Sequence, residues 1–333
     1  MPIKIFLVDQ NEHKTTSHLK AYWETDPRFI LDTDMYFNPL KAEWADYIWI
    51  EWCEGTIVQA SARKGGINEF NEVRLQHIIQ PARNDYDWSK AKIINRMIDI
   101  DVYYGHYRAV QWQNVDHLAY IARHIYDIAD KEMNFKDRFP NLKTTHIPLS
   151  INLNEYNFRK RDGSVKKLAW INHIWTGKGL PTMLQAFKAL CVADPTSKWE
   201  LHIAGYWSNE QWLRPYINHI ISEMGLVDQV KIYDWIPNVN DFLESFDYVV
   251  SSSFKEAFSL IAAESMAKGI KMLTHNWLGA KDIWPESCVW TTIDEFVAKI
   301  LANDYNSEYY RELASKYDKK YEIKAANKLM NLI

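Results

Sequence analysis

The stretch that indicates the fold most clearly is residues 251–269, Ser251-Ser-Ser-Phe-Lys-Glu-Ala-Phe-Ser-Leu-Ile-Ala-Ala-Glu-Ser-Met-Ala-Lys-Gly269. An apolar segment of strand character, Tyr248 to Ser251, leads into this stretch. Small and apolar residues then predict a helix over Leu260 to Lys268, and the glycine that follows is a common helix stop. A strand, a short loop and a helix in this order are typical of one βα unit of a parallel sheet.

The same alternation extends outward in both directions and indicates an α/β protein. Around the starting stretch we expect the strands Leu168 to Asn172, Trp199 to Ala204, Val230 to Tyr233 and Ile270 to Thr274, the helices Gly179 to Cys191 and Gln211 to Met224, and two or three helices from Thr292 onward. Nearer the N-terminus, strands are expected at Ile3 to Val8, Tyr47 to Ile50, Lys92 to Asn95, Leu118 to Ile121 and Thr144 to Ile147.

This pattern predicts two domains. We expect a Rossmann-like domain over residues 1–150, a polar linker over 151–166, a second Rossmann-like domain over 167–304, and closing helices over 305–333 that pack back toward the first domain. Open α/β sheets bind ligands outside the carboxyl ends of their strands. Function is therefore expected in a cleft between the two domains, on loops that follow strands.

The composition excludes several classes of protein. With 39 lysines and arginines against 43 aspartates and glutamates, the net charge of the 333 residues is −4, so no overall basic field attracts polyanions. The three cysteines lie far apart in sequence, which rules out a CxxC metal or redox pair and suits a reducing compartment. No segment has the roughly 20 apolar residues that span a bilayer, and a cytoplasmic location is expected.

Two carboxylates and a helix N-terminus come together in the starting stretch. Glu256 precedes the helix, and Glu264 lies about one to two turns inside it. Backbone N–H groups near Ala257, Phe258 and Ser259 are free at such a terminus, where the helix dipole favours a phosphate. The carboxylates can accept hydrogen bonds from sugar and ribose hydroxyls. Together these groups predict a site for a nucleotide-sugar.

The segment Glu256-Ala-Phe-Ser-Leu-Ile-Ala-Ala-Glu264 resembles the E-x7-E element of retaining, family 4 type glycosyltransferases, whose GT-B fold has two Rossmann-like domains. The Ser-Met-Ala-Lys-Gly-Ile run that follows and the Gly279 to Ile283 loop resemble that family as well. The resemblance covers about Leu168 to Ile283. It implies a hexosyl- or pentosyltransferase that takes a UDP- or GDP-linked sugar as co-substrate, needs no metal or other cofactor, and retains the anomeric configuration.

The resemblance also implies a role for each matching residue. Glu264 would hold the ribose hydroxyls and Glu256 the transferred sugar, with the amides near Phe258 and Ser259 at the phosphates. Lys178, in Thr176-Gly-Lys-Gly-Leu180, resembles the family lysine that meets the donor diphosphate.

Two further places in the donor site follow from the same likeness. The loop that contains Trp235 and Ile236 resembles the one whose backbone contacts the nucleobase. Where the family usually has Gly-Arg, this chain has Asn172-His173, so one of two cationic contacts to the diphosphate is changed. Either a protonated His173 or another cation takes that place.

Candidates for the acceptor side come from the first domain. Glu51 and Trp52 place a carboxylate and an indole directly after a strand, and Arg96 ends another strand. Structural packing is an equally good interpretation of Trp52 and Arg96. The histidine that the family carries in this domain has no clear counterpart, and His106 and His13 are the candidates.

Other patterns indicate less. Asp32-Thr-Asp34 and Asp99-Ile-Asp101 spell the DxD that holds a metal in other transferases, but solvated or turn residues explain both better. Gly177-Lys-Gly179 lacks the remaining residues of a Walker A loop, and GxGxxG and HExxH are absent. Arg159-Lys-Arg161 with Lys166-Lys167 is interpreted as a solvated linker, although such a cluster also suits the phosphates of a membrane surface or of nucleic acid.

The sequence therefore predicts a retaining, metal-independent glycosyltransferase that moves a sugar to a hydroxyl acceptor, with a glycan or lipid-linked acceptor favoured. The first alternative is an acceptor on a modified DNA base or a protein, because only the acceptor differs. The second is a catalytically silent GT-B module that binds a glycan or a partner protein, which the changed Asn172-His173 site motivates.

Overall fold

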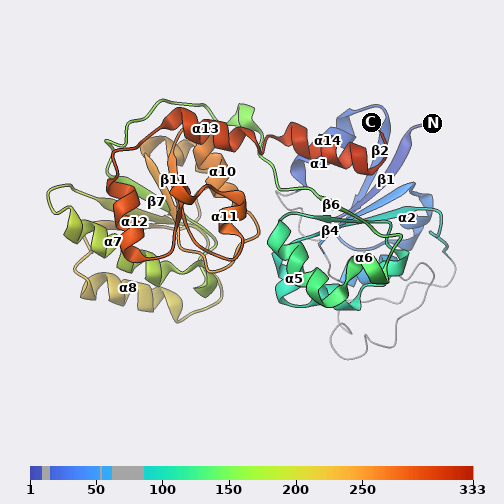
Figure 1. Ribbon diagram of the computed structural model, residues 1–333, viewed down its shortest axis with the longest axis horizontal. Coiled ribbons are helices and arrows are strands. Elements are labelled where there is room, and N and C mark those ends of the chain that lie inside the picture. Colours follow the sequence, from blue (N-terminus) through green and yellow to red (C-terminus); the bar gives the residue numbers. More distant parts are fainter. Residues whose placement is uncertain (10–15, 53–54, 62–85, 333) are drawn as a thin grey trace. The chain divides into compact units, whose positions relative to one another are not determined.

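The computed structural model describes residues 1–9, 16–52, 55–61 and 86–332 (Figure 1). The chain divides into unit 1, Met1–Ser150 with Lys319–Ile333, and unit 2, Ile151–Asp318. Residues 151–166 and 305–318 thus belong to unit 2. Each unit contains one parallel sheet with helices packed on it, which confirms the predicted α/β class with two Rossmann-like domains.

The sheet of unit 1 has the strand order β2-β1-β3-β4-β5-β6, and all its neighbours are parallel. The strands are β1 (Ile3–Val8), β2 (Phe29–Asp34), β3 (Tyr47–Glu51), β4 (Lys92–Met97), β5 (His117–Tyr120) and β6 (Lys143–His146). The helices are α1 (Ser17–Thr25), α2 (Pro39–Trp44), α3 (Gly55–Ser61), α4 (Asp99–Tyr103), α5 (Arg123–Met133), α6 (Phe135–Arg138) and α14 (Lys319–Leu329), with 3-10 turns η2 (His106–Ala109) and η3 (Trp112–Asn114).

Among the described strands of unit 1, β2 is the one that the sequence pattern did not predict; the helices of residues 1–150 were not predicted individually either. It lies at the sheet edge, where only Phe29 of its six residues is buried. Its apolar run, Phe29 to Leu31, is only three residues long, and its Asp-Thr-Asp end has the composition of a turn.

Helices α1 and α14 pack together over unit 1. Trp23 of α1 meets Trp49 of β3 edge to face, with ring centroids 5.4 Å apart. The Tyr47 hydroxyl donates a hydrogen bond to the carbonyl of Met330, just beyond α14, at 2.8 Å. The C-terminal helix is therefore an integral part of the core of unit 1.

The sheet of unit 2 has the parallel order β12-β11-β10-β7-β8-β9. The strands are β7 (Lys167–Ile171), β8 (Glu200–Ala204), β9 (Val230–Tyr233), β10 (Tyr248–Ser251), β11 (Lys271–His275) and the short, unpredicted edge strand β12 (Val289–Trp290). The helices are α7 (Leu180–Ala193), α8 (Leu213–Glu223), α9 (Val239–Phe242), α10 (Leu260–Ala267), α11 (Ala280–Ile283), α12 (Ile293–Leu301) and α13 (Ser307–Ser315), with 3-10 turns η4 (Leu153–Glu155), η5 (Thr176–Lys178), η6 (Leu243–Ser245) and η7 (Glu286–Cys288).

The strand order of unit 2 reverses between β7 and β10. From β7 the chain first builds outward through β8 and β9, then returns to the other side of β7 and continues through β10 and β11. The loops after β7 and β10 consequently leave the sheet side by side, while the connections that follow them run to opposite sides of the sheet. Such a switch point is where open α/β sheets bind ligands.

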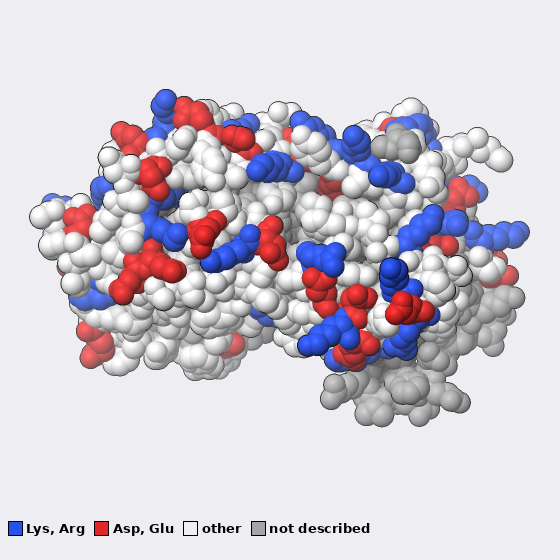
Figure 2. Space-filling view, viewed as in Figure 1, with Lys and Arg blue, Asp and Glu red and all other residues white. Residues whose placement is uncertain are grey.

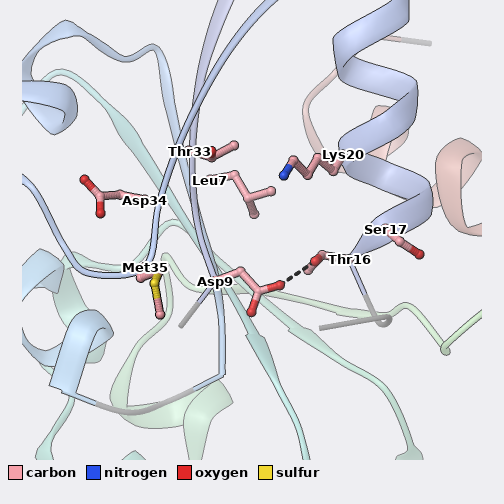
Figure 3. A pocket seen from close by; sticks show the side chains of 8 residues that line it. All are labelled: Leu7, Asp9, Thr16, Ser17, Lys20, Thr33, Asp34 and Met35. Carbon is pink, nitrogen blue, oxygen red and sulfur yellow. Dashed lines mark hydrogen bonds between the residues drawn. The ribbon is translucent and has the colours of Figure 1, made fainter. Parts of the chain in front are cut away.

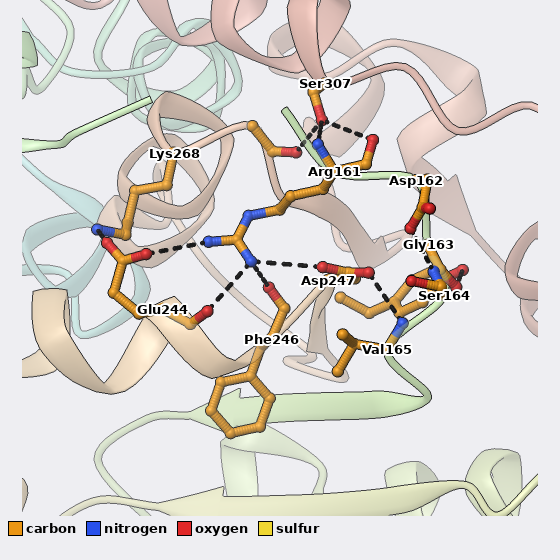
Figure 4. Close-up of polar contacts among 12 residues, drawn as sticks. Arg161, Asp162, Gly163, Ser164, Val165, Glu244, Phe246, Asp247, Lys268 and Ser307 are labelled. Carbon is orange, nitrogen blue, oxygen red and sulfur yellow. Dashed lines mark hydrogen bonds and ion pairs between the residues drawn. The ribbon is translucent and has the colours of Figure 1, made fainter. Parts of the chain in front are cut away.

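A buried arginine ties the segment before β7 to unit 2 (Figure 4). The Arg161 side chain is 1% exposed, and its Nη1 donates to the Phe246 carbonyl at 2.7 Å and to the Asp247 carboxylate at 3.3 Å. Its Nη2 lies 3.4 Å from Glu244, which also binds the buried Lys268. The prediction of a solvated linker is therefore wrong for Arg161. Carbonyls and carboxylates satisfy the guanidinium, and its partner Asp247 comes 86 residues later.

The structure also bears on the cysteines and on membrane-spanning segments, two subjects of the sequence analysis. Cys191 and Cys288 are free thiols, and Cys53 lies outside the described residues. Within the ranges that the structure describes, no helix combines the length and the apolar character that crossing a membrane requires.

Candidate active site

The loops after β7 and β10 are bonded to each other at the switch point of unit 2. The Ser252 hydroxyl donates to the carbonyl of Lys178 at 3.0 Å, and the Phe254 amide donates to the carbonyl of Gly177 at 2.9 Å. Gly179 has a φ of +65°, and a side chain there would place its Cβ 2.2 Å from the Ser252 carbonyl oxygen. A glycine is required for this close approach, which holds the Lys178 backbone in place.

The structure brings the predicted residues Lys178 and Glu256 into direct contact. The Lys178 Nζ lies 2.5 Å from Oε1 of Glu256. The two side chains are 18% and 13% exposed, so both groups are partly covered but remain at the surface. A cation and a carboxylate from two different loops are thus paired at the carboxyl ends of β7 and β10.

The N-terminus of α10 lies directly after this pair. Ser259 precedes the helix with a φ of 75°, and no side chain caps the terminus. In the described part of the chain, no hydrogen bond from the amides of Ala257, Phe258 and Ser259 occurs. The Phe258 ring is 1% exposed and packs against Trp284 and Tyr317, at 5.4 Å and 4.7 Å between centroids. Phe258 therefore anchors the loop, and only its backbone can face a ligand.

Glu264 lies inside α10 and is 4% exposed. Tyr156, from the segment before β7, has its phenol near this carboxylate: burial and then the charge of Glu264 raise the pKa of Tyr156. The Tyr156 carbonyl in turn accepts a hydrogen bond from Arg311 at 2.9 Å. Tyr156 was not predicted, because nothing in its local sequence indicates a contact with a helix more than 100 positions later.

A hollow of about 430 Å³ at the carboxyl ends of β7, β8 and β9 unites three predicted donor-binding residues, His173, Trp235 and Ile236. Trp235 is 70% exposed. His173 is also exposed, and its ring tilts against Tyr206 at 5.8 Å between centroids. The full lining is Ile171, Asn172, His173, Ala204, Gly205, Tyr206, Trp235, Ile236 and Val239. Most of this surface is apolar, which suits the flat face of an aromatic ring.

Tyr206 is a lining residue that the sequence reasoning missed. It is 60% exposed and follows Gly205, whose φ is +144°. A Cβ on Gly205 would lie 1.7 Å from the carbonyl oxygen of Asn172, so only glycine fits between the two strand ends. The available signal was an aromatic residue that follows a glycine directly after a predicted strand.

In unit 1, the predicted acceptor-side residues Glu51 and Arg96 are paired, but inside the protein. The Arg96 Nε lies 3.7 Å from Glu51 Oε1, and both side chains are 0% exposed. The Arg96 Nη1 also lies 2.6 Å from Glu322 of α14. Neither group reaches the surface, so the prediction that Glu51 and Arg96 bind the acceptor is wrong. Structural packing, the alternative interpretation of Arg96, describes both residues. Burial raises the pKa of Glu51 to about 7, and the nearby Arg96 offsets this only in part.

The other residues predicted in unit 1 have separate positions. Trp52 follows Glu51 with a φ of 76°, a left-handed conformation that a tryptophan rarely adopts. His106 begins η2 and stacks on Tyr104, with ring centroids 6.1 Å apart. The alternative candidate His13 lies outside the described residues.

The two DxD patterns have structural partners. Lys41 lies 2.9 Å from Asp32 and 3.4 Å from Asp34. The Asp101 carboxylate accepts a hydrogen bond from the Ile98 amide at 2.8 Å and so caps α4. Among the described residues, no group of three or more histidine, cysteine, aspartate or glutamate side chains has the arrangement of a metal site.

A second hollow of about 430 Å³ opens at the carboxyl ends of β1 and β2 in unit 1 (Figure 3). Lys20 of α1 extends toward it, and Asp9, which accepts a hydrogen bond from the Thr16 hydroxyl at 2.5 Å, lies at its lower end. Its lining comprises Leu7, Asp9, Thr16, Ser17, Lys20, Thr33, Asp34 and Met35. A cation, two carboxylates and three hydroxyls are suited to a hydroxylated ligand. The sequence analysis did not identify this hollow.

Comparison with known proteins gives a family match for one part of the chain. Residues 165–303, which cover most of unit 2, match the family model of glycosyl transferases group 1. No curated protein matches the chain in sequence.

Solved structures resemble the whole chain. HepE of Anabaena, solved with UDP, has a TM-score of 0.75 at 12% identity, with 100% of both chains covered. The lipopolysaccharide outer core galactosyltransferase WaaB has a TM-score of 0.67 at 12% identity, with 99% of each chain covered. TarM of S. aureus has a TM-score of 0.63 at 15% identity, over 86% of this chain and 54% of its own. At these identities the likeness establishes the fold, which is GT-B as predicted.

Proposed function

We propose, from the premise that this chain is a glycosyltransferase of the GT-B fold, that it moves a sugar from a nucleotide-sugar to a hydroxyl acceptor with retention of the anomeric configuration, as family 4 type enzymes do. The observation that carries this proposal is the Lys178–Glu256 contact at the switch point of unit 2. The contact lies before the uncapped N-terminus of α10, a position that favours anions, and this supports our assignment of Lys178 to the phosphates and of Glu256 to a sugar hydroxyl.

In this proposal the donor lies across unit 2. The nucleobase enters the apolar hollow beside Trp235 and Ile236, and the ribose hydroxyls bind Glu264. The diphosphate meets Lys178 and the amides before α10, and His173 at the rim of the hollow takes the place of the missing arginine. That HepE was solved with UDP and with UDP-glucose supports a UDP-linked donor.

The chemical step then needs charge stabilisation at the leaving diphosphate. Lys178 exchanges its Glu256 partner for phosphate oxygens, and Glu256 is released to hold a hydroxyl of the transferred sugar. The bond from the anomeric carbon to the phosphate oxygen breaks, and a bond from that carbon to the acceptor oxygen forms on the same face. The acceptor proton passes to the leaving phosphate oxygen. Because Lys178 and the helix amides offset the growing negative charge, we propose that no metal is required.

We further propose that the acceptor is a glycan or a lipid-linked sugar that binds unit 1. The hollow around Lys20, Asp9 and Asp34 offers donors and acceptors for sugar hydroxyls. The Lys20→Ala variant should weaken binding of such an acceptor while leaving donor hydrolysis unchanged, as followed by glycan-array binding and nucleotide release. Unchanged acceptor binding would remove this hollow from the proposal.

The decisive experiment screens UDP- and GDP-sugars for hydrolysis and transfer by mass spectrometry, with EDTA present and absent, and determines the anomeric configuration of the product by NMR. We expect retention and no loss of activity with EDTA. A nucleotide at 100 times its Kd should also stabilise the fold by about 2.7 kcal/mol. Inversion would exclude the family 4 mechanism, and no stabilisation or turnover with any nucleotide would favour the silent module.

Two variants separate the roles of the carboxylates. Glu256→Ala should abolish transfer and leave nucleotide binding intact, whereas Glu264→Ala should weaken nucleotide binding itself. The measurements are initial rates and calorimetric titration with the nucleoside diphosphate. If both variants match the parent protein, the assignment of this site is wrong.

A further inference from the structure

The exposed side of α14 carries only positive charge. Lys320, Lys324 and Lys328 are all exposed, and their spacing of four residues places them in a row along one side of the helix. We call these three residues the lysine row. Glu322, the one acid within α14, is 2% exposed and turns inward. Figure 2 shows basic side chains that follow the course of α14.

An aromatic residue accompanies the lysine row. Tyr321 is 49% exposed, and the Lys320 ammonium lies 5.0 Å from the centroid of its ring. A tyrosine has an apolar ring and a polar hydroxyl, which is the combination found where proteins meet the headgroup region of a bilayer. Long lysine side chains reach the same region with their stems on apolar surface and their charges outward.

The opposite side of α14 is fixed to unit 1, so the direction in which the lysine row points is fixed as well. The Asn327 amide donates to the Tyr22 hydroxyl at 2.8 Å, and Glu322 pairs with the buried Arg96. Leu329 and Met330 lie in the core. The row is thus a preformed basic surface on a rigid element.

The charge of the row differs from that of the whole protein. The chain has a net charge of −4, yet the exposed side of this helix has three positive charges within nine residues and no exposed acid. The other basic stretch that suits phosphates, Arg159 to Arg161, has lost Arg161 to the buried contacts with Asp247. The lysine row of α14 is therefore better suited to an anionic surface than the stretch Arg159 to Arg161.

We propose that the lysine row and Tyr321 dock unit 1 on the surface of an anionic phospholipid bilayer. A bilayer complements both features, because its lipid phosphates attract the ammonium groups and its headgroup region accommodates the phenol. A nucleic acid would complement the charges but leave the exposed tyrosine ring without a defined place. This inference goes beyond the proposed function and makes no use of the donor site.

The test is co-sedimentation of the full chain with vesicles of phosphatidylcholine alone or with about 30% phosphatidylserine, where each lysine adds roughly fivefold to the partition constant. The triple variant Lys320→Gln, Lys324→Gln, Lys328→Gln should lose about 100-fold of the binding to anionic vesicles. A matched control replaces three other exposed lysines of unit 1 and changes the net charge equally: Lys90→Gln, Lys131→Gln, Lys136→Gln. The control should bind as the parent does.

Tyr321→Ala distinguishes a bilayer from another polyanion, because it should weaken binding to anionic vesicles and leave binding to duplex DNA unchanged. Three results would overturn the proposal: no preference of the parent protein for anionic vesicles, equal losses in the triple variant and its control, or tight binding to DNA with none to vesicles. Hydrolysis of UDP-sugars without vesicles is measured in parallel for each protein. If hydrolysis continues while vesicle binding fails in the parent protein, only the docking proposal is wrong.

Discussion

Both units place a cation and a carboxylate together where parallel strands end, yet the two pairs differ in every other respect. In unit 2, Lys178 and Glu256 come from loops, and their side chains are 18% and 13% exposed. In unit 1, Arg96 and Glu51 belong to strands β4 and β3, and both are 0% exposed. The first pair is accessible enough for the partner exchange that we propose, whereas in the second pair Arg96 also binds Glu322 of α14.

The difference shows that residue types at a strand end do not by themselves define a site. Arg96 is surrounded because α14 returns to unit 1 and covers the sheet with Glu322, whose second oxygen accepts a hydrogen bond from Ser150. The Ser150 hydroxyl also contacts His18 of α1, 2.9 Å away. A cation paired with a carboxylate is thus our proposed substrate contact in unit 2, whereas in unit 1 such a pair joins a helix to the sheet.

The largest effect is expected where the buried pair is broken. Arg96→Met should destabilise unit 1 by about 3 to 5 kcal/mol, because Glu322 and Glu51 would remain buried without their cation. Calorimetric unfolding measures this. Arg123→Met is the control, since Arg123 forms an exposed ion pair with Asp127 at 2.7 Å and should cost less than about 1 kcal/mol. A loss of transfer without a loss of stability in Arg96→Met would instead make Arg96 a ligand contact.

Breaking the Lys178–Glu256 pair should reduce activity and leave stability nearly unchanged. Lys178→Ala is expected to lower the rate of transfer about 100-fold or more, since it removes a charge from the leaving diphosphate, and to change the unfolding temperature little. Lys255→Ala is the control: this neighbour of Glu256 lies over the Trp175 ring at 5.4 Å and is not placed at the diphosphate. Equal loss of activity in the two variants would contradict the role of Lys178.

A pH dependence should distinguish the buried pair from the exposed one. Glu51 has a folded pKa of about 7, above its ordinary value of 4.5, so unfolding releases a proton between these pH values. Stability that Glu51 provides at low pH is therefore lost as the pH rises through about 7, by roughly 1 kcal/mol per pH unit at most.

The Glu51→Gln variant is the reference for this effect. Burial lowers the pKa of His117 in the same unit to about 4, which gives a slope of the opposite sign below pH 6.5 and cancels in the comparison. We expect the difference in free energy of unfolding between parent and variant to change from pH 5 to about 7 and to level off above that. A constant difference across that range would mean that Glu51 is ionised throughout.

The smallest effect is expected for Tyr156, whose phenol lies near Glu264, a proposed donor-binding residue of unit 2. Tyr156→Phe removes the hydroxyl near the Glu264 carboxylate and should raise the KM for the donor about fivefold, the equivalent of about 1 kcal/mol, with a smaller change in kcat. A donor that lacks the ribose hydroxyls should be affected less. Tyr248→Phe removes another buried hydroxyl, bonded to the Gly163 carbonyl at 3.2 Å, and serves as the control.

Much of the fold could be predicted because its signals are local. Strand β1 runs from Ile3 to Val8 as its apolar run predicts, and α10 begins at Leu260 where the small residues begin. The edge strands β2 and β12 were not predicted. Most residues of β2 are not buried, and β12 has only two residues. The period of apolar residues reports burial, and an edge strand has little of it.

The candidate site was predictable only in unit 2, where the groups lie in short loops beside a recognisable helix start. His173, Trp235 and Ile236 were inferred from separate segments and line one hollow. Tyr206 and Tyr156 were missed, since their positions depend on neighbours from other elements.

By itself, the amino-acid sequence determined the alternation of strands and helices and the spacing of Glu256 from Glu264, because these depend on interactions within a few residues. Only the tertiary structure decided which charged pair stays open. Arg96 is closed off by Glu322, 226 positions later in the chain, and desolvation acts on charges according to what surrounds them in space. A basic residue and a glutamate can therefore form a candidate active site in one unit and part of the core in the other.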